Sequence, residues 1–82
     1  MIRLHPHAEI RLSERGVTEE EAIETVRSGE QFAAKFGRTG FRRNFEYNGN
    51  WLDKFYASKE VHVIAARDGD GWLVITVMAK FF

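Results

Sequence analysis

Residues 16–29 read GVTEEEAIETVRSG and contain the start and end signals of one short helix. Thr18 is a favoured N-cap residue, and Glu21, three positions later, completes a capping box. The glutamates of the first turn suit the positive end of the helix dipole, and Gly29 is a common helix terminator. The stretch therefore predicts a helix over residues 18–28, in which the glutamates are structural and not catalytic.

A second helical signal lies directly before this stretch. Pro6 suits the first turn of a helix, because its missing N–H costs nothing there. Gly16 supplies the left-handed residue that often ends a helix. We therefore expect another helix over residues 6–15.

After residue 29 the composition changes to aromatic and β-branched residues, with turns at regular spacing. Asn48-Gly49 is the expected hairpin turn, because both residues tolerate positive φ. This pattern predicts strands over residues 31–36, 41–47, 51–57, 61–67 and 72–79. We therefore expect an α+β fold over residues 1–82, with two N-terminal helices packed on a four- to five-stranded antiparallel sheet in a single domain.

The composition limits the classes of protein that remain. The chain has 82 residues, 44% of them hydrophobic and 29% charged, which allows one folded domain and argues against disorder. The absence of cysteine excludes disulfides, thiolate zinc sites and a cysteine nucleophile, and is compatible with the cytoplasmic location that we expect. No apolar run is long enough to span a membrane, so no membrane partner is expected.

The net charge of zero hides a segregation along the chain. The sums are +1 for residues 1–16, −4 for 17–30, +4 for 31–45 and −1 for 46–82. A polyanion responds to the local field rather than to the total charge. The zero sum therefore excludes only a uniformly basic binder of nucleic acid.

The first helix carries one stripe of functional residue types. At about 100° per residue, His7, Arg11 and Arg15 fall within roughly 80° of one another, at the edge of the buried face. An imidazole can move a proton, and guanidinium groups bind phosphate, which is the chemistry that cleavage of an RNA phosphodiester requires. Alternatively, the two arginines pair with glutamates of the helices and His7 acts as a helix cap.

The strand region adds further candidates. Lys54 and Tyr56 share one face of a predicted strand. A basic side chain can bind a phosphate and an aromatic ring can stack on an unpaired base, so this pair suits a single-stranded nucleic acid. Arg43 is a third candidate from the basic segment. Thr76 interrupts an apolar strand, and it either bonds a neighbouring backbone group or faces a cleft opposite the first helix. His62 is interpreted as a partly exposed strand residue.

The two ends of the chain resemble a known family. His7-Ala8, Arg11 and Glu14-Arg15-Gly16-Val17, followed by the Glu-rich helix and by the strand LVITV at 73–77, are similar to a group of small bacterial proteins known only as a domain of unknown function. That group is placed by analogy with the RelE-like and BrnT-like toxins, and with the barnase–EndoU–colicin–RelE ribonuclease fold. Residues 31–58 show little of the resemblance.

This resemblance implies a metal-independent ribonuclease fold and marks His7, Arg11, Arg15 and Thr76 as catalytic. The first hypothesis is therefore an RNA-cleaving toxin-like domain, either a toxin–antitoxin component or the effector end of a larger toxin. Its partners would be RNA and a neutralising antitoxin or immunity protein, with no metal and no cofactor. The alternative is a non-catalytic module of the same fold that binds RNA or protein.

Overall fold

The computed structural model describes all 82 residues and contains the two expected helices, α1 (Pro6–Arg15) and α2 (Glu19–Ser28). Gly16 ends α1 in the left-handed region, at φ 68°. At the start of α2, Thr18 Oγ1 accepts from the Glu21 N–H at 3.1 Å, and Glu21 Oε1 accepts from the Thr18 N–H at 2.9 Å. The capping box predicted from the sequence is therefore confirmed. No helix has the length and apolar character needed to cross a membrane.

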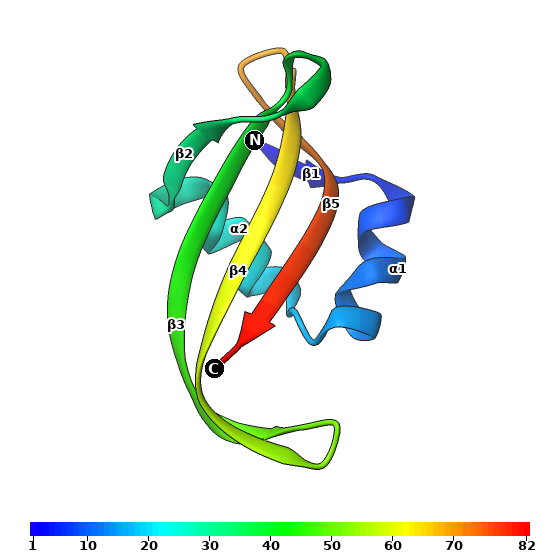
Figure 1. Ribbon diagram of the computed structural model, residues 1–82. Helices are drawn as coiled ribbons and strands as arrows, with labels where there is room; N and C mark the ends of the chain where they lie inside the picture. Colours follow the sequence, from blue (N-terminus) through cyan, green and yellow to red (C-terminus); the bar gives the residue numbers. More distant parts are fainter.

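The sheet has five strands, in the spatial order β1-β5-β4-β3-β2 (Figure 1). Their bounds are β1 Ile2–Leu4, β2 Glu30–Ala33, β3 Thr39–Trp51, β4 Lys54–Asp68 and β5 Gly71–Phe81. β1 runs parallel to β5, whereas the other neighbouring strands are antiparallel. The α+β class is confirmed, and the expected antiparallel pairing holds for β2 to β5 but not for β1. β1 was missed because three residues are too few to show a strand pattern.

The predicted hairpin turn at Asn48-Gly49 is wrong. Asn48 does have a positive φ of 48°, but the pairing register shifts between Glu46 and Gly49, so that this segment is an irregularity inside β3. The chain reverses instead at Leu52 and Asp53, with φ of 52° and 67°. The left-handed conformation of Asn48 therefore belongs to a β-bulge, which bends the strand without ending it.

Two other predicted boundaries also differ. Of the strand expected over residues 51–57, only residues 54–57 are in β4, because Trp51 ends β3 and the chain turns at 52–53. These residues and the strand expected over 61–67 form one continuous strand, in which Lys59 is buried and not exposed in a turn. The strand expected over 31–36 ends at Ala33. It is followed by a 3-10 turn, η1 (Lys35–Gly37), in which Phe36 has a positive φ of 62°.

Both helices pack on the same side of the sheet. α1 contacts β5 and β1, and α2 contacts β4 and β3. The core between them includes the fully buried Val61, Val63 and Val77 from the strands and Ala8 and Ala22 from the helices. Figure 1 shows α2 crossing behind β3 and β4, with the opposite side of the sheet toward the viewer. No helix covers that side, which we call the open face.

Candidate active site

The alternation of β4 sends a histidine and a glutamate to the open face. Val61 and Val63 point into the core, so Glu60 and His62 point away from the helices. Their side chains meet, with His62 Nε2 at 2.9 Å from Glu60 Oε1. Both side chains are 29% exposed, which leaves them within reach of a ligand.

Positive groups surround the carboxylate of this pair. The hydrogen bond with His62 lowers the pKa of Glu60 despite the opposing effect of burial, and the charges of His62, Arg42 and Lys80 lower it further. Lys80 is the cross-strand partner of Glu60 on β5, and Arg42 is that of His62 on β3. Glu60 therefore remains ionised and accepts a hydrogen bond from His62 Nε2.

Thr76 lies on the same open face. It is the cross-strand partner of Ile64, and Met78 is the partner of His62, so Thr76 is diagonal to His62 across β4 and β5. A register irregularity in β5 directly precedes this position, because Ala65 already pairs with Val74. Bulges of this kind redirect side chains and are common beside active sites. Thr76 is thus a neighbour of His62.

An aromatic side chain on β2 packs against the His62 ring. The Phe32 ring meets the His62 ring edge to face at 6.0 Å, and the Arg42 guanidinium lies 5.5 Å from the Phe32 ring centre. Phe32 reaches this position only because its neighbour on β3 is Gly40. A Cβ at residue 40 would stand 2.2 Å from the Phe32 ring. Arg42 itself forms a salt bridge with Glu30 on β2.

A hollow of about 390 Å³ opens beside the pair. It is lined by Glu60, His62, Met78, Ala79 and Lys80. Lys80 forms none of the molecule's salt bridges, so its ammonium is available to an anion. The hollow therefore combines a group that can move a proton with a cation that can hold a phosphate.

The predicted catalytic residues of α1 lie elsewhere. His7 is exposed, and its ring stacks on His5 at 5.1 Å. Arg11 is also exposed and forms an ion pair with Glu14 at 2.7 Å. Both residues belong to the helix side of the sheet, whereas Thr76 belongs to the open face. The structure therefore does not bring them together in the cleft expected between α1 and the last strand.

Three other predicted site residues gather near the β3–β4 hairpin. Arg15 donates from Nη1 to the Val77 carbonyl at 2.9 Å and lines a hollow together with Phe81. The Tyr56 ring lies 5.5 Å from the Phe81 ring, and Lys54 Nζ lies 5.6 Å from the Tyr56 ring. These residues form a second group, and the hollow beside Arg15 shares two lining residues with the open-face hollow.

Arg43 joins neither group. It faces the helix side of β3, where Nη1 lies 3.5 Å from Glu24 Oε2 on α2 and the guanidinium lies 4.8 Å from the Phe45 ring. Arg43 thus has local partners between the sheet and α2.

The sequence interpretation passed over the Glu60–His62 pair. The signal was the alternation of residue types, because Glu60 and His62 alternate with Val61 and Val63 and therefore lie together on the opposite face of the strand. The side of the sheet that the helices cover could not be known from that pattern. Lys80 was missed for the same reason, since only the strand register sets it opposite Glu60.

The fold and site define a small α+β domain with two helices on one side of a mixed sheet and a histidine–carboxylate pair on the other. Residues 4–79 match the model of a family described as a domain of unknown function (DUF4258), and the chain belongs to this family. The expectation of a small domain of unknown function is thereby confirmed. No curated protein and no solved structure matches the chain.

Proposed function

We propose that this protein is a metal-independent endoribonuclease that cleaves RNA on the open face of its sheet. The observation that carries the proposal is the 2.9 Å hydrogen bond between Glu60 and His62 on an uncovered strand. The analogy that places the resembling group with the RelE-like and BrnT-like toxins supports the same class of reaction. The chemistry needs a proton-transfer group and cations, and the open face offers both.

In the proposed reaction, His62 Nδ1 accepts the proton of an RNA 2′-hydroxyl while Glu60 holds the imidazole through Nε2. The 2′-oxygen forms a bond to the adjacent phosphorus, and the bond from phosphorus to the 5′-oxygen breaks. The 5′-oxygen takes up the proton that His62 received. The products are a 2′,3′-cyclic phosphate and a 5′-hydroxyl.

The remaining open-face groups stabilise the substrate in this scheme. Lys80 binds the non-bridging phosphate oxygens, because its ammonium lies beside the reacting pair and forms no salt bridge. Thr76 donates its hydroxyl proton to a phosphate oxygen or to the sugar. Among the residues predicted from the sequence, Thr76 keeps a role at the reacting phosphate.

The direct test is incubation of the purified protein with single-stranded RNA in excess EDTA. We expect cleavage that leaves 2′,3′-cyclic phosphate ends, and no cleavage of RNA whose 2′-hydroxyls are methylated. Gel electrophoresis and mass spectrometry of the fragments measure both results. Intact RNA after prolonged incubation, or equal cleavage of the methylated strand, contradicts the proposed chemistry.

A second candidate function is the binding of another protein. Leu52 and Phe55 in the β3–β4 hairpin are 80% and 60% exposed, and Phe82 at the end of the chain is 54% exposed. We propose that these side chains contact a partner such as an antitoxin or immunity protein. Expression in bacteria without a partner distinguishes the two functions. Growth arrest that requires His62 supports the enzyme, whereas harmless expression of a protein inert toward RNA supports the binding module.

A further inference from the structure

The turn η1 presents an aromatic ring to solvent. Phe36 is 87% exposed, so its ring contributes little to the core. Its backbone has φ 62° and ψ 32°, a left-handed conformation that bulky residues rarely adopt. Strained positions of this kind concentrate at functional sites. The fold therefore holds an exposed phenyl ring in an unfavourable conformation with no packing role that accounts for it.

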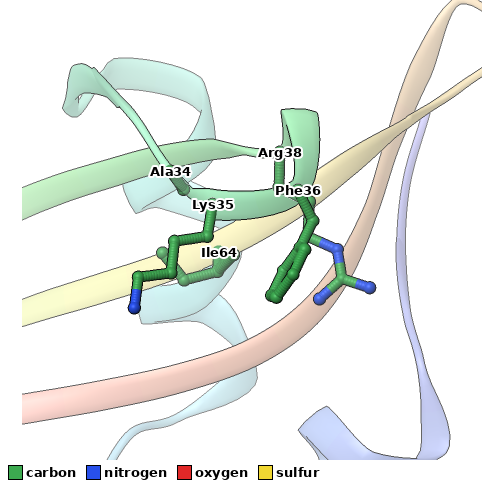
Figure 2. Close-up of a pocket in the computed structure, with 5 residues that line it drawn as sticks. All are labelled: Ala34, Lys35, Phe36, Arg38 and Ile64. Atoms are coloured by element: carbon green, nitrogen blue, oxygen red, sulfur yellow. The ribbon is translucent and has the colours of Figure 1, made fainter.

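The ring borders a hollow of about 340 Å³ on the open face. Figure 2 shows its lining, with Lys35 and Phe36 projecting on the same side as Ile64, and the Arg38 guanidinium beside the phenyl ring. The distance from the Arg38 Cζ atom to the ring centre is 5.9 Å. Ala34 completes the lining.

The charges around this hollow have one sign. Lys35 and Arg38 flank Phe36 in the chain, and neither takes part in a salt bridge. No carboxylate lines the hollow. Two unpaired cations on either side of an exposed ring complement a ligand that is both aromatic and anionic, such as a nucleotide within a single strand.

The hollow is also placed next to the candidate active site. Ile64 lies on the open face two residues beyond His62 on β4, which is a separation of about 6.6 Å along the strand. Thr76 is the cross-strand partner of Ile64 and is diagonal to His62, so it neighbours both regions. A strand of RNA on the open face can therefore contact both.

We propose that Phe36, Lys35 and Arg38 form a subsite that stacks one unpaired base of single-stranded RNA and holds its flanking phosphates, next to the reacting phosphate at His62. The inference rests on the proposed function, because it supplies the binding position for that substrate. Stacking is tolerant of base identity, so the subsite selects unpaired RNA over duplex RNA and not one base over another.

The test measures the affinity of a fluorescein-labelled, 2′-O-methylated single strand of ten nucleotides by fluorescence anisotropy. Methylation prevents cleavage by removing the 2′ nucleophile. We expect Phe36→Ala to weaken binding about 5- to 100-fold, and Phe36→Trp to retain it. Phe55→Ala is the matched control, because Phe55 is also an exposed phenylalanine but lies in the β3–β4 hairpin. An abasic strand of equal length should bind wild type and Phe36→Ala alike.

The outcomes separate this inference from the proposed function. Equal affinity of Phe36→Ala and Phe55→Ala for the intact strand overturns the stacking subsite, while cleavage by the wild type would leave the proposed function standing. A Phe36→Ala effect that persists on the abasic strand also overturns it, because no base remains to stack. Failure of the wild type to bind or cleave any single strand overturns both proposals.

Discussion

A Lys59→Ala variant is expected to lose about 3–5 kcal/mol of its free energy of unfolding. The Lys59 side chain is 3% exposed, and its Nζ donates to the Gly16 carbonyl at 2.8 Å and to Glu21 Oε1 at 2.7 Å. It also lies 4.9 Å from the Tyr47 ring centre. Truncation leaves the carbonyl and a largely buried carboxylate without this partner, in a domain whose total stability is on the order of 5–15 kcal/mol. Urea denaturation followed by circular dichroism measures the loss.

Lys54→Ala is the matched control for this prediction. Lys54 lies on the same strand and is exposed, so its removal should change the free energy of unfolding by less than about 0.5 kcal/mol. If Lys59→Ala does not fold at all, Lys59→Met keeps most of the buried alkyl volume and gives a measurable urea midpoint below that of the wild type. Equal midpoints for Lys59→Met, Lys54→Ala and the wild type would show that the buried ammonium does not join β4 to the helices.

His62→Ala is expected to reduce the rate of RNA cleavage by about 10²- to 10⁴-fold, which is the usual contribution of a group that transfers a proton in the transition state. The variant should have a lower kcat and an unchanged KM, because the imidazole acts on the reacting atoms and the cations that bind the substrate remain. Single-turnover cleavage of a labelled RNA, with enzyme in excess, measures the chemical step directly.

His7→Ala is the control for this second prediction, since the resemblance marks His7 as catalytic and the structure places it on α1, stacked on His5. We expect the His7→Ala rate to match the wild type. Circular dichroism spectra of both variants should overlay that of the wild type, because neither imidazole is buried in the core. A loss of rate in His7→Ala with full activity in His62→Ala would place the reaction on the first helix.

Local sequence signals were sufficient to predict the helix boundaries but not the boundaries of the strands. The capping box at Thr18 and the terminating Gly16 act within a few residues, so the sequence predicted both helices to within one residue. Asn48-Gly49 has the composition of a turn, yet long-range pairing with β4 continues past it and places the reversal at Leu52 and Asp53. Tertiary pairing overrode a local preference that was itself correct, because Asn48 does adopt a positive φ.

The site could be predicted only in part for a related reason. The helical period sets the angles between the residues of α1, but it carries no information on which side of the sheet remains uncovered. Thr76 was predicted with partners on α1, and the register with Ile64 gives it His62 as a neighbour instead. Lys59 shows the same dependence, because its buried contacts join residues 43 and 38 positions apart in the chain.

The central claim is that single-stranded RNA binds on the open face at His62. The chain contains three histidines, His5, His7 and His62, so the imidazole proton signals in an NMR spectrum report on both sides of the molecule. Titration with the 2′-O-methylated single strand should shift the His62 signals progressively and leave those of His5 and His7 in place. Shifts of the His7 signals with unchanged His62 signals would contradict the account.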